Sequence, residues 1–90
     1  MTSWCLYIVK CTDGSLYTGI TLDVSRRLKE HEDGKGSKYL RGRGPLELVF
    51  SHQFESRNKA LRQEARLKKW PRRKKEQLIR GEILLLPEAE

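Results

Sequence analysis

The sequence predicts an α+β fold, in which a small three-stranded antiparallel sheet is flanked by helices in the order β-β-α-β-α-α. Two runs rich in aromatic and β-branched residues stand on either side of turn residues near the start of the chain, which is typical of a β-hairpin. One further strand-like run lies between segments with helix caps and helical spacing. The chain has 90 residues, which is room for one domain, and we expect that domain over 1–82 with a short tail over 83–90.

Caps and turn residues set the expected boundaries of these elements. Asp23 and Ser56 are good N-cap residues, Gly34 and Gly36 end the first helix, and Pro71 breaks or restarts the helical pattern after Ser56. The expected strands cover 4–10, 16–20 and 46–52, and the expected helices cover 24–32, 57–69 and a stretch that ends near residue 80. The pattern does not decide whether the third strand lies at the edge or the centre of the sheet.

The loop of the expected hairpin decides where two tyrosines lie. A two-residue turn would place the rings of Tyr7 and Tyr17 on opposite faces of the sheet. A three-residue loop with Gly14 in the left-handed conformation pairs residue 9 with residue 17 and residue 7 with residue 19, so both rings share one face. In that case Gly19 leaves open space beside Tyr7. A tyrosine in a strand is also an ordinary core residue, so this pattern alone does not assign a role.

Positive charge is concentrated in two parts of the chain. The 19 Lys and Arg against 12 Asp and Glu give a net charge of +7. Residues 57–81 hold 11 of these basic residues against 2 Glu, and the Gly-rich stretch 34–44 adds four basic residues and no acid. This pattern suits a phosphate backbone, and a solvated helix face beside a loop is the alternative. The candidate nucleic-acid contacts are Lys35, Lys38, Arg41, Arg43, Lys68, Lys69, Arg72 and Arg73.

The apolar segments and cysteines favour a cytoplasmic protein. The longest apolar run, Trp4–Val9, is far shorter than the roughly 20 residues of a membrane span, and no export signal is recognisable. Cys5 and Cys11 fall on the first strand about 20 Å apart, which is too far for a disulfide. We therefore expect buried thiols and no membrane partner.

One acidic residue falls where an apolar one belongs on the second helix. Helical spacing there defines an apolar arc of Ala60, Leu61, Ala65 and Leu67. Glu64 lies near the middle of this arc, and a carboxylate turned toward a core or cleft is costly unless it is paired or bound to a metal. The alternative is a surface Glu64 that forms an ion pair with Lys68, four residues on.

The first helix carries two polar residues at its buried edge. Val24 and Leu28 set the apolar stripe, His31 falls inside it, and Arg27 borders it one turn earlier. A histidine in such a place is often a satisfied core residue. At a spacing of four residues, Arg27 has no evident carboxylate partner within the expected helix, and a guanidinium at a cleft edge suits an incoming phosphate.

These residues together resemble the GIY-YIG nuclease superfamily, especially its short stand-alone bacterial members. The resemblance spans Trp4 to Arg80 and depends on the spacing of five parts, which are Cys5-Leu6-Tyr7, Tyr17-Thr18-Gly19, Arg27, His31 and Glu64. It implies the three-stranded fold and hydrolysis of DNA phosphodiester bonds without a covalent intermediate. It also implies a divalent metal, usually Mg²⁺ and alternatively Mn²⁺.

The resemblance implies a role for each residue. Glu64 would hold the metal, Tyr7 and Tyr17 would position or deprotonate the attacking water, and Arg27 would brace the phosphate. His31 would assist proton transfer. The partner would be DNA rather than RNA, recognised by structure or with weak sequence preference, in DNA repair or recombination.

The sequence departs from the family pattern in two places, and other functions are therefore also considered. Cys5 and Leu6 replace the Gly and Ile of the first motif, and no Asn follows Glu64, whereas Asn58 precedes it. The missing Asn motivates a second hypothesis, a nucleic-acid-binding module with weak or no catalysis. A third is an interaction module that docks on a protein partner through Leu84–Leu86 and the acidic tail.

Overall fold

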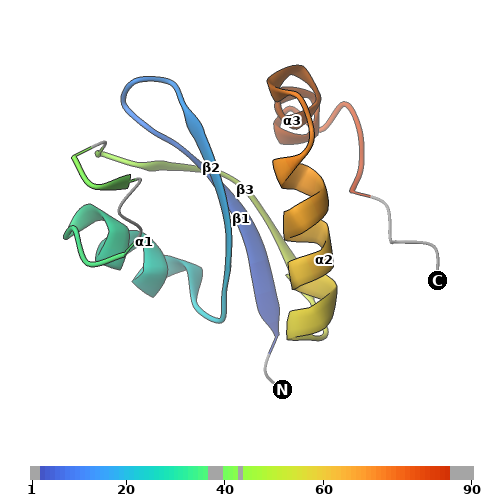
Figure 1. The fold of residues 1–90 in the computed structure, drawn as a ribbon, viewed down its shortest axis with the longest axis horizontal. Coiled ribbons are helices and arrows are strands. Elements are labelled where there is room, and N and C mark those ends of the chain that lie inside the picture. Colours follow the sequence, from blue (N-terminus) through green and yellow to red (C-terminus); the bar gives the residue numbers. More distant parts are fainter. Residues whose placement is uncertain (1–2, 37–39, 43, 86–90) are drawn as a thin grey trace.

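The structure, a computed structural model, describes residues 3–36, 40–42 and 44–85. It is a three-stranded antiparallel sheet with helices on both faces. The elements are β1 (Trp4–Lys10), β2 (Leu16–Thr21), α1 (Val24–Glu32), β3 (Glu47–Phe54), α2 (Arg57–Lys68) and α3 (Arg72–Ile79). Helix α1 covers one face of the sheet, and α2 and α3 lie on the other (Figure 1). The predicted fold class and element order are confirmed.

The sheet has the order β2-β1-β3, so both neighbours of the central strand β1 are edge strands. Strand β3 pairs with β1, and the pairing shifts by one residue between Ile8, opposite Phe50, and Val9, opposite Leu48. Val49 is the extra residue of this bulge. Val49 and Phe50 both pack against the cluster beneath α2 and α3, which regular alternation could not have produced.

The hairpin between β1 and β2 has the three-residue loop. Val9 pairs with Tyr17 and Tyr7 with Gly19, so the two tyrosines lie on the same face of the sheet. Gly14 has a φ of +87°, the left-handed conformation that this loop requires, and its N–H donates to the carbonyl of Cys11 at 2.9 Å. The two-residue alternative is excluded.

The predicted helix ends are also present. The Asp23 side chain accepts from the N–H of Arg26, and the Ser56 side chain accepts from that of Lys59. Helix α1 ends at Glu32, and Asp33 is its C-cap. Gly34 follows with a φ of +77°, and the N–H groups of Gly34 and Lys35 donate to the carbonyls of His31 and Glu30. These caps fix the directions in which α1 and α2 leave the sheet.

Alternation along β1 divides the core into two clusters. Leu6 and Ile8 pack with Leu67 and Leu78 beneath α2 and α3. On the α1 face the buried cluster consists of Tyr7, Val9, Cys11 and Leu40. Strand β1 is therefore buried on both faces, and its odd-numbered residues face α1.

The segment after α3 returns to the first of these clusters. Ile83 and Leu85 pack against the core, whereas Leu84 is 77% exposed. Of the residues expected to dock on a partner, Leu86 and the acidic tail lie outside the described residues. Within the described part of the chain, no helix is long and apolar enough to cross a membrane. Cys5 and Cys11 are buried free thiols, as expected.

Candidate active site

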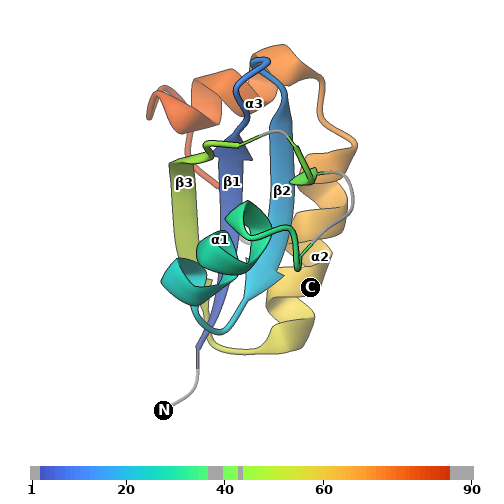
Figure 2. The ribbon, with the colours of Figure 1, turned by 90° about the vertical axis from the view of Figure 1, so that its left-hand side faces the viewer.

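Three aromatic side chains meet on the α1 face of the sheet. Tyr7 comes from β1, Tyr17 from β2, and His31 from the last turn of α1. The two tyrosine ring centroids are 6.4 Å apart, and the His31 ring lies 6.2 Å from that of Tyr7 and 5.6 Å from that of Tyr17. The three-residue loop is what makes this cluster geometrically attainable, because it puts both phenols on the face that α1 covers (Figure 2).

A hydrogen bond of 2.9 Å joins the Tyr7 hydroxyl to Nε2 of His31. Two glycines make room for this pair. A Cβ at Gly19 would lie 2.6 Å from the Tyr7 hydroxyl oxygen, and a Cβ at Gly36 would overlap the His31 imidazole. The space beside Gly19 that the sequence predicted is thus filled by the Tyr7 phenol. The sequence does not show that residue 36 must be glycine, because this requirement arises from the position of the His31 imidazole in the folded structure.

The environment keeps both members of this pair neutral near pH 7. Burial raises the pKa of Tyr7 to about 12; Tyr17 and the negative charge of Glu64 also raise it, against a hydrogen bond and the positive charge of Arg27. The pKa of His31 is lowered, first by burial and then by the charge of Arg27, while Glu30 opposes the shift. A neutral imidazole beside a protonated phenol can accept the phenolic proton through Nε2 in one of its two tautomers.

Arg27 stands beside the tyrosine pair at the partly exposed edge of α1. Its hydrogen bond to Tyr7 and its charge both favour the phenolate form of that residue. Arg27 has a carboxylate neighbour at a spacing of three residues rather than four, because a carboxylate oxygen of Glu30 lies 3.6 Å from its Nη1. Both side chains are more than a third exposed, so this pair is weak and a phosphate can compete for the guanidinium.

Glu64 is turned away from solvent on α2. Its side chain is only 17% exposed, and its carboxylate lies 3.5 Å from the ammonium of Lys68, which is 54% exposed. The predicted inward orientation and the alternative ion pair therefore occur together. The carboxylate is close enough to Tyr7 for its charge to raise the phenol pKa, although α2 covers the opposite face of the sheet.

The buried arc of α2 differs from the expected one by one position. Gln63 is buried with Ala60 and Leu67, whereas Ala65 is exposed. Ala65 was placed in the buried arc because it is apolar, but alanine occurs on both the buried and the exposed faces of helices. This rotation moves Glu64 from the middle of the arc to its border.

The residues around Glu64 fit a magnesium ion that takes most of its ligands from water and substrate, and they do not fit a metal enclosed by protein ligands. Among the residues that the structure describes, no cluster of three or more His, Cys, Asp or Glu side chains could hold a metal. A single half-enclosed carboxylate is the minimal protein ligand that Mg²⁺ accepts, because this ion keeps several waters and takes phosphate oxygens from a substrate. The position opposite the carboxylate already accommodates a cation, the Lys68 ammonium.

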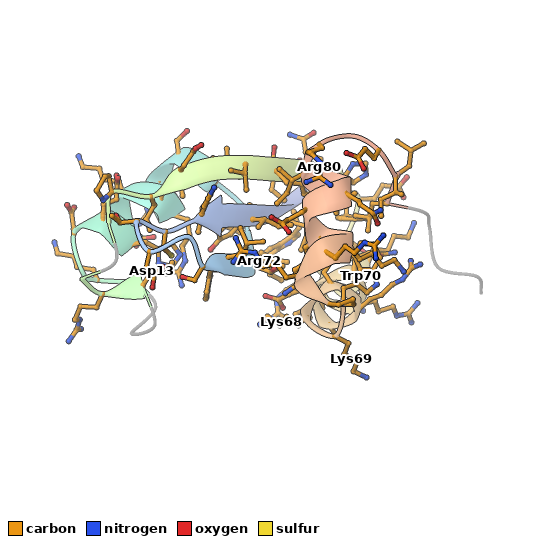
Figure 3. The ribbon with its side chains drawn as sticks, turned by 90° about the horizontal axis from the view of Figure 1, so that it is seen from above. Asp13, Lys68, Lys69, Trp70, Arg72 and Arg80 are labelled. Carbon is orange, nitrogen blue, oxygen red and sulfur yellow. The ribbon has the colours of Figure 1, made fainter. Side chains whose placement is uncertain are left out.

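The predicted nucleic-acid contacts fall on both sides of the sheet. Lys35 and Arg41 follow α1, and both are exposed; Lys38 and Arg43 lie outside the described residues. The remaining four, Lys68, Lys69, Arg72 and Arg73, lie at the junction of α2 and α3 (Figure 3). Arg72 is engaged by Glu76 at 3.7 Å. The two basic groups are thus separated by the β2 edge rather than joined in one patch.

Comparison with known proteins agrees with the geometry. Residues 3–77 match the family model described as the GIY-YIG catalytic domain. The chain is 54% identical over 83 residues to a UPF0213 protein of Cronobacter sakazakii, an alignment that covers 92% of this chain and 87% of that protein.

Two solution NMR structures are similar in fold and sequence. The UPF0213 protein BH0048 from Bacillus halodurans matches with a TM-score of 0.57 and 53% identity, over 86% of this chain and 82% of that chain. The protein EF2693 from E. faecalis matches with a TM-score of 0.65 and 36% identity, over 100% and 96% of the two chains. The chain belongs to the GIY-YIG family, as the sequence motifs predicted. Membership indicates a nuclease as the class of activity, nucleic acid as the partner and a divalent metal as the general cofactor.

Proposed function

We propose that this protein is a metal-dependent endonuclease that hydrolyses phosphodiester bonds of DNA. The observation that carries the proposal is the 2.9 Å contact between the Tyr7 hydroxyl and Nε2 of a neutral His31, with Arg27 hydrogen-bonded to the same phenol. A buried tyrosine in a core needs one partner for its hydroxyl. A basic nitrogen and a guanidinium at the same oxygen are better suited to moving a proton.

The chemistry assigned to the chain is a proton relay. A phenol with a pKa of about 12 is a poor base by itself, so Tyr7 passes its own proton to Nε2 of His31 as it takes one from the attacking water. The oxygen of that water forms the new bond to phosphorus, and the bond to the leaving sugar oxygen breaks, with solvent supplying the proton to that oxygen. Tyr17, whose ring is close to both residues, positions the water.

Arg27 stabilises the charge that develops on the pentacoordinate phosphate. Its weak pairing with Glu30 leaves the guanidinium available once a phosphate arrives. Glu64 would hold the divalent ion, which would supply further neutralisation of phosphate charge. Arg27 and Glu64 both influence the pKa of Tyr7 from different layers of the fold, which supports a position between them for the scissile phosphate.

The substrate assigned to this site is DNA rather than RNA, recognised by structure or with weak sequence preference, in repair or recombination. The basic groups on both sides of the β2 edge can follow a phosphate backbone that crosses that edge. Such contacts position a duplex or strand without reading its bases.

A second function, binding without catalysis, is favoured by one observation. Lys68 already neutralises the Glu64 carboxylate, and no Asn follows Glu64 to add a second oxygen ligand. A module of this kind would bind DNA with a steep salt dependence and would not cut it under any metal condition.

Cleavage assays separate the two functions. The substrates are single-stranded, duplex, flapped and branched DNA, each with Mg²⁺, with Mn²⁺ and with neither. We expect metal-dependent cutting that falls at least about 100-fold in Tyr7→Phe and in Glu64→Gln. The matched control is Glu55→Gln, which removes the carboxylate of another ion pair with a lysine four residues on, at a position 87% exposed. Equal activity of Glu64→Gln and the wild type would refute the proposal.

A further inference from the structure

A pocket of about 280 Å³ lies at the turn between β2 and α1, next to the candidate active site. Figure 2 shows this turn at the lower end of the sheet. The apolar part of the lining consists of Trp4, Ile20 and Leu22, and the basic part consists of Arg26 and Arg27. Because Arg27 also hydrogen-bonds the Tyr7 phenol, the pocket and the candidate active site share one residue.

Two apolar side chains of this pocket are not part of the core. Trp4 is partly exposed and Leu22 is 50% exposed, and neither belongs to the two clusters that form the core of the described residues. The Arg57 guanidinium lies over the Trp4 ring, 5.6 Å from its centroid, and adds positive charge beside the pocket. An aromatic ring among basic groups is the arrangement that binds the bases of single-stranded nucleic acid by stacking.

The negative charges of the lining already have partners inside the protein. Asp23 caps α1 by accepting from the N–H of Arg26, and Glu30 forms the ion pair with Arg27. Arg26 itself is exposed, and its guanidinium has no ion pair within the described part of the chain. A ligand with a flat apolar body and an attached negative charge fits this distribution, and a nucleotide has both parts.

The pocket lies a short distance along β2 from the Tyr7 phenol. Gly19 pairs with Tyr7 and leaves room for the phenol, and Thr21, which lines the pocket, pairs with Cys5. Two residues along a strand correspond to about 7 Å. A nucleotide whose phosphate contacts Arg27 can therefore extend its base into the pocket.

We propose that this pocket binds an unpaired nucleobase of the DNA, stacked against Trp4 and Leu22, beside the phosphate that Arg27 binds. The substrate class is then DNA with an unpaired nucleotide next to the cut, such as a single strand or a flap, because a base inside a duplex cannot enter a pocket. Every base has a flat face to stack, so the pocket selects unpaired structure and not sequence. This inference rests on the proposed nuclease function for the position of the cut.

The first test measures binding without metal, so it does not depend on cleavage. The chain has two tryptophans, and Trp70→Phe leaves Trp4 as the only one. The probes are oligothymidylate and a deoxyribose-phosphate oligomer of the same length, which has the same charge and no bases. We expect oligothymidylate alone to quench the Trp4 fluorescence saturably and to bind about 10-fold more tightly. Equal affinity of the two oligomers, or no quenching of Trp4, would overturn the pocket.

The second test uses variants and the fluorescence anisotropy of labelled oligothymidylate. Trp4→Leu keeps an apolar side chain but removes the stacking surface, and it should weaken binding about 5-fold. Leu22→Ser changes a residue that is 50% exposed, so the fold tolerates it, and it should weaken binding by at least about 2-fold. Leu48→Ser is the matched control, because Leu48 is 41% exposed on β3, at the other edge of the sheet. Binding by Leu22→Ser as tight as by Leu48→Ser would overturn the inference.

The two proposals fail in different ways. A wild type that cuts flapped DNA equally well with and without an abasic nucleotide on either side of the cut would keep the nuclease and remove this inference. Base-dependent quenching of Trp4 in a protein that cuts no DNA with any metal would keep the pocket and remove the nuclease.

Discussion

Replacing Gly19 by alanine should displace the Tyr7 phenol. The added Cβ would lie 2.6 Å from the hydroxyl oxygen and 2.7 Å from Cζ, whereas such atoms normally approach to about 3.5 Å. The ring must therefore move by roughly 0.8 Å, and Tyr7 is 1% exposed, so there is no free space on its other side. Overpacking of this size costs about 1–3 kcal/mol, partly offset by about 0.5–1 kcal/mol because alanine suits a strand better than glycine.

The same displacement should reduce activity more than stability. The hydroxyl is held 2.9 Å from Nε2 of His31, and a misplacement near 1 Å costs about 100-fold in a reaction that depends on this contact. Urea unfolding and single-turnover DNA cleavage measure the two effects. Gly44→Ala is the control, because a Cβ there meets nothing closer than 4.0 Å. If Gly19→Ala folds and cleaves as the wild type does, Tyr7 does not act through the position described here.

Three further predictions follow from buried polar groups. Thr18→Val should raise the free energy of unfolding by about 1 kcal/mol, because the buried Thr18 hydroxyl has no hydrogen-bond partner among the described residues; urea denaturation tests this, and a loss of stability would refute it. Because the folded state lowers the pKa of His31, the unfolded chain binds more protons than the folded chain at pH values below about 6.5. Stability should therefore be complete above about pH 6.5 and fall below it by at most about 1.4 kcal/mol per pH unit, and His31→Gln should flatten this slope in urea midpoints measured across that range. Tyr7 should ionise near pH 12 in an ultraviolet titration of the folded protein, and Tyr7→Phe should remove that step alone.

Local chemistry made most of the fold predictable. Asp23 and Ser56 cap the helices they were expected to cap, because capping depends on residues within one turn. The hairpin register could be narrowed to two alternatives, since the turn sequence allowed two loop lengths, and Gly14 adopts the positive φ of the longer one. The bulge at Val49 had no signal, because it depends on pairing with β1.

The sequence predicted which residues form the candidate site better than it predicted the contacts between them. The polar residues on buried faces pointed to His31 and Glu64, and His31 is indeed 2% exposed. Helical spacing offered Lys68, four residues on, as a partner of Glu64, and that ion pair is present. Helical spacing did not show that the Glu64 side chain would at the same time be only 17% exposed, because this depends on how α2 is rotated against the sheet. The packing of Gly36 on His31 is a tertiary contact that no local pattern records.

The central claim is that Glu64 and the Tyr7 phenol serve one phosphate from the two layers of the fold. A crystal structure of the Tyr7→Phe variant with uncut DNA and Mn²⁺ tests this most directly, because the anomalous signal of the ion locates the metal independently of the protein. We expect a manganese peak at the Glu64 carboxylate, with a DNA phosphate between it and Arg27 at the β2 edge. A peak away from Glu64, or DNA seated where neither Arg27 nor position 7 can reach a phosphate, would contradict the account.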